Sequence, residues 1–493
     1  MSSEKTKTKG SIVMFPFMAQ GHIIPFLALA FQIEKRGYNI IFITTPLNIK
    51  NLKPLIPPSS TLRLLPIPFD PTSHGLPPTA ENTDTLPYPL IIRLLQASLS
   101  FKQPFRNILS NLIDRDESPL CVIADIFFGW SAQISSELGI FNVIFSGAGG
   151  FGLGCYYSVW LNLPHRESNS LQEFSLPDFP EAGTFHVTQL AASFLAADGK
   201  DDWSIFQREN LPGWRNSDGI LFNSVDMIDE KGFLYFKRKL GIPVWPIGPI
   251  LLSGDNGKKQ VGVSREICVQ WMDSKPVNSV LFIAFGSQNT ITATQMMRLA
   301  NAIERIEELN FIWVVRPPLG FDINSEFKPD EWLPEGFMNR LCNDQNRGLI
   351  AVQWAPQMEI LSHNSVGGFI THCGWNSVLE ALSCGVPLIG WPMAAEQFFN
   401  AKFLEEEMGV CVEVARGTNF EVRVEDIERK IGKVMKEGSE IGMEMRRKAG
   451  EVGSLIKDAI RDDGSFKGSS VRAMDQFLEA ARLKTKKSSC STK

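Results

Sequence analysis

The sequence predicts an α/β protein with two doubly wound parallel sheets, each covered by helices. Two observations lead to this fold class. Short apolar runs alternate with helical patterns along the chain, and the alternation starts afresh after a Gly/Asp/Lys-rich stretch at Leu252–Gln260. Such alternation favours parallel sheets, because each crossover helix returns the chain to the same edge of the sheet. With 493 residues, of which 44% are hydrophobic, the chain is long enough for two full cores.

The first half contains five apolar runs of strand length. We expect strands at Ser11–Phe17, Asn39–Thr45, Leu62–Pro66, Leu120–Ala124 and Phe141–Phe145. After the first strand we expect a loop at Met18–Pro25 and then a helix through about Arg36. Two stretches, Asp70–Pro87 and His165–Thr184, are expected to be long loops, which often carry function.

The second half repeats the pattern. We expect a helix at Thr292–Leu309 and strands at Ser279–Phe285, Phe311–Val315, Leu349–Val352, Val366–Ile370 and Pro387–Ile389. Ligands of open parallel sheets bind at the carboxyl ends of the strands. The candidate site loops are therefore Met18–Pro25, Asp125–Gly129, Ser146–Gly150, Gly286–Gln288, Gln353–Gln357 and Thr371–Ser377.

Composition argues against several classes of function. The net charge is only −5, and no basic cluster indicates a nucleic acid or a membrane surface as partner. No uninterrupted apolar segment reaches the roughly 18 residues of a membrane span, so we expect a cytoplasmic protein. The eight cysteines form no C-x-x-C pair, and no His/Cys cluster has zinc spacing. The basic tail from Lys484 to Lys493 is expected to be frayed.

The segment Thr371–Ser377 has the features of an anion site. It follows an apolar strand and precedes a helix expected at Val378–Ser383. Gly374 permits close approach, and Asn376 and Ser377 are favourable N-cap residues. A helix N-terminus beside such donors can bind a diphosphate, although an ordinary N-cap would give the same pattern.

Polar and aromatic residues flank this segment. Glu380 lies among apolar neighbours, and a carboxylate there needs partners such as the two hydroxyls of a ribose. Upstream, Trp354 could stack on a flat base, with Gln357 as hydrogen-bonding neighbour. Downstream, Glu396 and Gln397 suit sugar hydroxyls. Each residue alone has an ordinary structural explanation as core, cap or turn.

Together these residues resemble the 44-residue signature of the plant secondary-product glycosyltransferases, a UDP-dependent family. The match runs from Trp354 to Gln397 and contains WAPQ, HCGWNSVLEAL, GVP, WP and EQ in order. GHIIPFL, IADIFFGW and VLFIAFGS are also similar to segments of that family. The resemblance is highly specific and extends over most of the chain.

The resemblance implies two Rossmann-like domains facing a cleft, the GT-B fold. The implied division is an acceptor-binding domain at residues 1–252, a UDP-sugar-binding domain at 253–465, and a C-terminal helix, about Ser469–Leu483, that packs back on the first domain within 466–493. The implied activity is transfer of a sugar, glucose by preference, from a UDP-sugar to a hydroxyl of a small lipophilic acceptor. We expect a monomer that needs no metal.

The resemblance also implies roles for individual residues. Trp354, Ala355 and Gln357 would hold the base and ribose, and Glu380 the ribose hydroxyls. The remaining donor contacts would be His372, Asn376, Ser377 and Ser287 on the diphosphate and Trp375, Glu396, Gln397 and Ser146 on the sugar. Glu396 departs mildly from the family, where Asp is common. Gln397 is the residue that generally accompanies glucose.

The base is expected from the first domain. The family places a catalytic His and an assisting Asp at the positions of His22 and Asp125. Imidazole takes a proton near neutral pH, and Asp125 could fix its tautomer by accepting a bond from Nδ1. A UDP-sugar-binding protein without activity would lack this pair, so catalysis is favoured over that alternative.

Three further features of the sequence bear on its function. An acceptor pocket is expected from four aromatic residues near the site loops, although each could equally be core: Phe17, Phe127, Phe128 and Tyr156. Gly147, Gly149 and Gly152 form a G-x-G-x-x-G pattern, but it follows a late strand, which disfavours an NAD-dependent oxidoreductase. Asp114 and Asp116 imitate a metal-binding D-x-D but read as a solvated turn.

Overall fold

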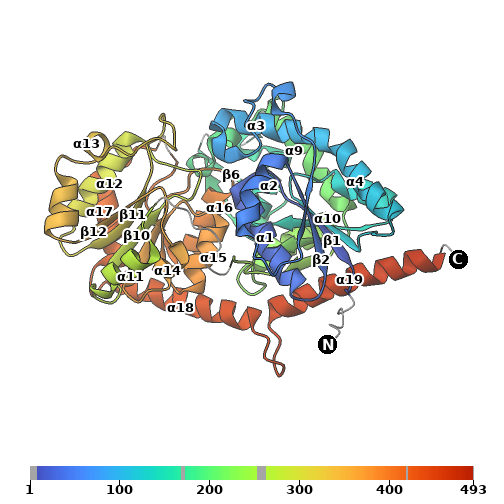
Figure 1. The fold of residues 1–493 in the computed structure, drawn as a ribbon. Coiled ribbons are helices and arrows are strands. Elements are labelled where there is room, and N and C mark those ends of the chain that lie inside the picture. The colour runs from blue at the N-terminus through green and yellow to red at the C-terminus, as the bar shows by residue number, and fades with distance from the viewer. Residues whose placement is uncertain (1–7, 168–171, 253–261, 418–419, 492–493) are drawn as a thin grey trace.

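The computed structural model describes residues 8–167, 172–252, 262–417 and 420–491. Two α/β domains lie side by side (Figure 1), each built on a sheet whose strands pair in parallel. The first sheet has the order β3-β2-β1-β4-β5-β8-β9 and the second the order β12-β11-β10-β13-β14-β15. The predicted pair of doubly wound sheets is therefore confirmed, and the fold is GT-B.

The strands fall close to the expected runs, with ends shifted by one or two residues. Those of the first sheet are β1 (Ser11–Phe15), β2 (Asn39–Thr44), β3 (Arg63–Pro66), β4 (Cys121–Asp125), β5 (Phe141–Ser146), β8 (Gly219–Phe222) and β9 (Val244–Pro246). Those of the second are β10 (Val280–Ala284), β11 (Asn310–Val315), β12 (Gly348–Val352), β13 (Val366–Thr371), β14 (Leu388–Gly390) and β15 (Cys411–Glu413). β8, β9 and β15, which have three or four residues each, were not predicted.

The helices cover both faces of each sheet. In the first domain they are α1 (Gln20–Glu34), α2 (Pro46–Leu52), α3 (Tyr88–Ala97), α4 (Lys102–Asp114), α5 (Ser131–Glu137), α6 (Gly150–Asn162), α7 (Pro164–Glu167), α8 (Ala192–Ala196), α9 (Asp202–Asn210) and α10 (Glu230–Leu240). The second part of the chain contains α11 (Arg265–Asp273), α12 (Ala293–Arg305), α13 (Pro329–Trp332), α14 (Gln357–Leu361), α15 (Trp375–Ser383), α16 (Gln397–Lys402), α17 (Val424–Met435), α18 (Glu440–Ile460) and α19 (Ser469–Ser491).

Three expectations about irregular segments were wrong. The loop expected at Met18–Pro25 is mostly helix, because α1 begins at Gln20 and contains Pro25. The tail after Lys484 continues α19 as far as Ser491 instead of fraying. The two long loops contain short helices and a small antiparallel pair, β6 (Glu173–Ser175) with β7 (Thr184–His186). The linker expected at Leu252–Gln260 lies, apart from Leu252, outside the described residues.

The C-terminal helix joins the two domains. Figure 1 shows α18 running along the second domain and α19 continuing beneath the first. Met474 and Phe477 of α19 are buried in the same apolar cluster as β1, β2 and β4. Lys484 forms an ion pair of 2.7 Å with Asp218, just before β8. α19 therefore packs on the first domain.

Aromatic rings also fix the domains relative to each other. Phe151 of α6 stacks on Phe403 of the second domain, with 4.8 Å between ring centroids. Phe399 of α16 lies edge-on to Phe185, at 5.5 Å. These rings belong to one apolar cluster that contains residues of both domains. Within the described residues, no helix combines the length and apolarity needed to cross a membrane.

Candidate active site

Both sheets reverse their strand order at the point where the candidate residues gather. In the first sheet the reversal lies between β1 and β4, and in the second between β10 and β13. His22 follows β1 and Asp125 ends β4, while Ser287 follows β10 and His372 follows β13. Open α/β sheets bind ligands at such switch points, because neighbouring connections diverge there and leave space.

His22 and Asp125 form the predicted pair. Nδ1 of His22 lies 2.9 Å from Oδ2 of Asp125. The carboxylate is fully buried, and its oxygens also accept bonds from the backbone N–H groups of Phe17 and Phe127, each at 3.1 Å. His22 lies in the first turn of α1, not in a loop, and its side chain is 26% exposed. Its Nε2 is therefore the nitrogen left for a substrate.

The surroundings of His22 make it a stronger base. Burial acts to lower the pKa of His22, but attraction to Asp125, the hydrogen bond to Asp125 and attraction to Glu396 outweigh it, so the pKa is raised above 6.5. Asp125 belongs to the same domain as His22, whereas Glu396 belongs to the second domain. Glu396 of the second domain therefore acts electrostatically on His22 of the first domain.

The candidate diphosphate site is bounded by His372 and two glycines. A Cβ on Gly286 would lie 2.8 Å from the ring of His372, and one on Gly374 would lie 2.4 Å from its Nε2. Only glycine leaves room for the ring at these positions. Burial lowers the pKa of His372 to about 4, so the ring is neutral and donates one N–H.

Helix α15 points its N-terminus into this site. The N-cap is Gly374, so the expectation that Asn376 or Ser377 caps the helix was wrong. Both residues lie instead in the first turn of α15. Gly374 provides no side-chain bond to the free N–H groups, which therefore remain available to an anion.

The signature segment Trp354–Gln397, called the donor box below, and the residue before it contain three non-glycine residues with left-handed backbone conformations. Gln353, Cys373 and Ala395 have φ angles of 66°, 60° and 50°. Each costs about 1–3 kcal/mol and persists only where the surrounding structure demands it. Gln353 and Ala395 precede Trp354 and Glu396, and Cys373 follows His372, so each strained residue adjoins a predicted donor residue.

A polar cluster lies where the ribose was expected. Nε2 of Gln357 donates to Oγ of Ser377 at 3.1 Å and to Oε2 of Glu380 at 2.5 Å. Burial raises the pKa of Glu380 to about 7 despite the bond from Gln357. Trp354, partly exposed, and Ala355, buried, lead into α14 beside this cluster. The arrangement can bind a diol next to a flat base.

Trp375 and Asn376 connect the box to the first domain. The indole N–H of Trp375 donates to the carbonyl of Asn223 at 2.8 Å, so the ring is buried between the domains. Nδ2 of Asn376 donates to the carbonyl of Gly21 at 3.3 Å, one residue before His22. That carbonyl is free because Pro25, four residues on, has no N–H to donate within α1.

The candidate sugar residues differ in how they are held. Oε1 of Gln397 accepts bonds from the backbone N–H groups of Met393 and Ala394, at 3.0 and 2.9 Å, which orients its amide. The pKa of Glu396 is raised by burial, against the lowering effect of its own backbone N–H, His22 and Asn400. Ser146 is fully buried and bonds to Ala148 within its own loop.

The aromatic residues expected at the acceptor pocket separate into two groups. Phe17 and Phe127 lie 5.8 and 5.2 Å from the ring of His22. Tyr156 is buried against Phe194, its hydroxyl accepts a bond from Gln207 at 2.7 Å, and burial and the charge of Glu396 both raise the Tyr156 pKa. Phe128 is completely buried, 4.4 Å from Phe15, and belongs to the core.

The glycine pattern after β5 serves domain packing. A Cβ on Gly149 would lie 2.8 Å from Trp375, and one on Gly152 would lie 2.0 Å from Asn400. These glycines let the second domain approach α6. Asp114, the last residue of α4, and Asp116 are exposed before the amino end of β4, whereas His22 lies beyond the carboxyl end of β1. Among the residues with assigned positions, no group of three or more His, Cys, Asp or Glu side chains could hold a metal.

Sequence reasoning missed residues that support the site. Asn223 is fully buried. Its carbonyl accepts the bond from Trp375, and its Oδ1 accepts a bond from the N–H of Ile250. Arg316 joins two loops of the second domain. A polar residue directly after a buried strand was the available signal for both: Asn223 follows β8, which was not predicted, and Arg316 follows β11.

Comparison with known proteins identifies relatives over nearly the whole chain. UDP-glycosyltransferase 92A1 of Arabidopsis thaliana is 50% identical over 483 residues, covering 96% of this chain and 97% of the relative. The chain belongs to the plant UDP-glycosyltransferase family. Crocetin glucosyltransferase 3 of Crocus sativus is 40% identical over 85% of this chain and 90% of its own length. The family model described as "UDP-glucoronosyl and UDP-glucosyl transferase" matches residues 246–441.

Solved structures of family members share the fold. Glycyrrhiza uralensis UGT73P12, complexed with glycyrrhetinic acid 3-O-monoglucuronide, has a TM-score of 0.81 at 27% identity, covering 98% of this chain and 97% of that one. Phytolacca americana UGT2, complexed with UDP-2fluoro-glucose and pterostilbene, has a TM-score of 0.74 at 25% identity, covering 96% and 99%. The chain is thus a UDP-dependent glycosyltransferase of the GT-B fold.

Proposed function

We propose that this enzyme transfers glucose from UDP-glucose to a hydroxyl of a small lipophilic acceptor such as a flavonoid, phenolic or terpenoid, with inversion at the anomeric carbon. One observation carries the proposal. Asn376 of the donor box bonds to the carbonyl of Gly21, the residue before His22, across the two domains. A donor bound by the box would therefore lie beside the base.

The chemistry follows from the positions of the two groups. Nε2 of His22 takes the proton of the acceptor hydroxyl while the hydroxyl oxygen attacks the anomeric carbon of the sugar. The bond from that carbon to the β-phosphate oxygen breaks, and UDP leaves with the electron pair. Asp125 holds Nδ1–H and stabilises the imidazolium. Attack from the face opposite UDP inverts the configuration.

The leaving diphosphate needs stabilisation, for which we propose the N–H groups at the start of α15, together with His372 and Ser287. Preorganised donors of this kind stabilise charge that develops in the transition state. We propose that the reaction needs no metal or other cofactor. Glu380 and Gln357 would bind the ribose and Trp354 the uracil, while Glu396 and the oriented amide of Gln397 would bind the sugar.

For the domains we propose acceptor binding by residues 1–252 and donor binding by 253–465. Phe17, Phe127 and Tyr156 would line the acceptor site. The relatives and the solved structures support this assignment of substrates by analogy: a crocetin glucosyltransferase is 40% identical, and UGT2 of Phytolacca americana is complexed with UDP-2fluoro-glucose and pterostilbene.

The experiment is a product analysis. Purified enzyme is incubated with UDP-glucose and a panel of hydroxylated flavonoids, phenolics and terpenoids, and glucosides are detected by mass and chromatography. His22→Ala should lower turnover about 10²- to 10⁴-fold, the usual contribution of a general base. UDP affinity should change little, because His22 lies in the other domain. Near-wild-type turnover of His22→Ala with a weakly acidic hydroxyl would contradict the assignment of the base.

A further inference from the structure

Arg316 lies at the carboxyl end of β11 and bridges two loops. Its Nη1 donates to the carbonyl of Ser287 at 2.8 Å, and its Nη2 donates to the carbonyl of Gln353 at 2.9 Å. Ser287 follows β10, and Gln353 follows β12, so one guanidinium joins the connections on both sides of its own strand. The planar fork of arginine suits such a two-carbonyl contact, which the single ammonium of lysine does not match.

The two bridged loops carry the proposed contacts of UDP. Ser287 belongs to the diphosphate site, and Gln353 directly precedes Trp354, the proposed uracil platform. Gln353 is also one of the strained positions, with φ of 66°. A bond to the carbonyl of Gln353 helps to hold that conformation, and with it the direction in which the chain presents Trp354.

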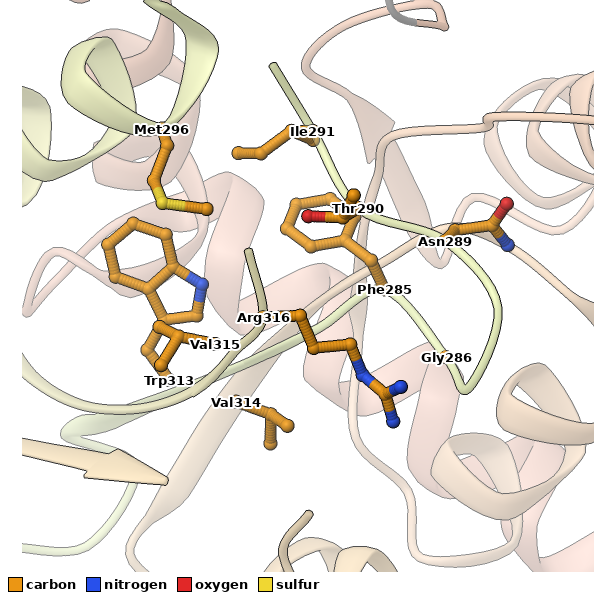
Figure 2. A pocket seen from close by; sticks show the side chains of 10 residues that line it. All are labelled: Phe285, Gly286, Asn289, Thr290, Ile291, Met296, Trp313, Val314, Val315 and Arg316. Carbon is orange, nitrogen blue, oxygen red and sulfur yellow. The ribbon is translucent and has the colours of Figure 1, made fainter. Parts of the chain in front are cut away.

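Arg316 also brings positive charge to this edge of the sheet. Figure 2 shows its guanidinium beside Gly286 and pointing away from Trp313 and Met296. Its Nε is buried, with no hydrogen-bond partner in the described part of the chain. Burial lowers the pKa of Arg316 while the charge of Asp84, in the first domain, raises it. His372 is neutral because its pKa is about 4, so it adds no charge to the diphosphate site.

The same loop is held from the opposite side. Nε2 of Gln288 donates to Oγ1 of Thr83 and, at 2.6 Å, to Oδ1 of Asp84. Residues 287 and 288 are thus fixed by Arg316 within the second domain and by a short helical turn at Thr83–Thr85 of the first. The loop that would meet the diphosphate is held by partners on two sides.

We propose that Arg316 is a positioning residue for the UDP moiety: it sets the separation of Ser287 and Trp354 and places a positive charge behind the diphosphate loop. The proposal rests on the proposed function, since it assumes that UDP occupies the box. Arg316 acts through the backbone of Ser287 and Gln353, so its removal should weaken UDP binding more than it slows the chemical step.

The test measures UDP binding by calorimetry for the wild type, Arg316→Met and Arg316→Lys. Arg347→Met is a matched control, because Arg347 also donates to backbone carbonyls, of Leu309 at 3.1 Å and Ile306 at 2.5 Å, but at the amino end of β11 and β12. Hydrogen bonds from a charged group are among the stronger ones in proteins. Loss of both bonds in Arg316→Met should therefore weaken UDP binding about ten- to hundredfold. Arg316→Lys keeps the positive charge but cannot bond to both carbonyls, so we expect it to weaken UDP binding roughly three- to tenfold.

Kinetics separate positioning from general damage. For both Arg316 variants the KM for UDP-glucose should rise by a larger factor than kcat falls. Arg347→Met should lower the melting temperature and leave UDP affinity within about twofold, since it removes similar bonds far from the donor loops. Melting curves without UDP show that each variant is folded, and Arg316→Lys gives a second reading if Arg316→Met does not fold.

The outcomes distinguish this inference from the proposed function. Wild-type enzyme that binds no UDP would overturn the proposed function. Wild-type enzyme that binds UDP, with both Arg316 variants binding it equally well, would overturn only the positioning role. Arg316→Lys with wild-type affinity beside a weakened Arg316→Met would overturn the bridging geometry, because charge alone would then suffice.

Discussion

Replacing Asp125 by Asn tests the pair with His22 and keeps the side-chain volume. Both carboxylate oxygens accept bonds: Oδ2 from His22 and from the N–H of Phe17, and Oδ1 from the N–H of Phe127. An amide has one acceptor oxygen, so its –NH₂ must face one of these donors. If the –NH₂ takes the place of Oδ1, it meets the N–H of Phe127, which is one donor–donor conflict. If it takes the place of Oδ2, it meets the N–H of Phe17 and also forces the opposite tautomer on His22. The first orientation should therefore be preferred.

In that orientation the bond to His22 survives but loses its charge. The difference between a charged and a neutral hydrogen bond is about 1–2 kcal/mol, so kcat/KM should fall roughly five- to thirtyfold at pH 8. The reversed tautomer would cost far more, up to about 10⁴-fold. A loss within the smaller range would thus also indicate which way the amide points.

The pH profile gives an independent reading. Only neutral His22 can accept a proton, so activity falls as the pH drops through its raised pKa, above 6.5. Asp125 causes most of the upward shift of the His22 pKa. Without its charge, burial still lowers that pKa, and only the attraction to Glu396 opposes the lowering. In Asp125→Asn the acid limb should therefore move to lower pH. A rate at pH 8 within threefold of the wild type, with an unmoved acid limb, would refute the assisting role of Asp125.

Three further predictions concern the donor site. Activity should persist in excess EDTA, because α15, His372 and Ser287 would stabilise the diphosphate; loss that magnesium or manganese restores would contradict this. With equal donor concentrations, glucoside should exceed galactoside at least about tenfold, since a mismatched buried hydrogen bond at Gln397 costs about 1–3 kcal/mol; a dominant galactoside or pentoside would show that Gln397 does not set the preference. Glu380→Ala should weaken UDP binding about tenfold or more and should weaken dUDP binding by a smaller factor, because dUDP lacks the 2′-hydroxyl and keeps only the 3′-hydroxyl; equal weakening of both in calorimetry would argue against a contact with the 2′-hydroxyl.

Periodicity predicted the fold because most strands are apolar runs of five or six residues separated by helices. It failed where local pattern is weak or tertiary contacts decide. β9 has three residues and ends in Pro246, so its sequence resembles a linker. α1 includes Pro25, although proline is favoured at the first position of a helix and α1 begins five residues earlier, at Gln20. The carbonyl that Pro25 leaves free is used by Asn376, 355 residues away from Gly21.

The candidate residues were found because the box is contiguous in sequence, from Trp354 to Gln397. The residues that hold the candidate residues in place were not found from the sequence, because these partners come from distant segments of the chain. Trp375 was expected at the sugar, and the partner that its indole N–H has in the structure is the carbonyl of Asn223, which lies 152 residues earlier. Phe128 adjoins Phe127 in sequence, but neighbouring side chains diverge, and only Phe127 faces His22. Sequence identifies such residues; their direction depends on the packed structure.

The most direct test of the account is the anomeric configuration of the product. UDP-glucose carries an α-linked sugar, so a single displacement assisted by His22 must give a β-glucoside. Proton NMR of the purified product distinguishes the two anomers through the coupling of the anomeric proton. We predict the β-anomer from the wild type and its near-complete loss in His22→Ala. An α-glucoside, or UDP binding without transfer to any hydroxylated acceptor in the panel, would contradict the proposed reaction.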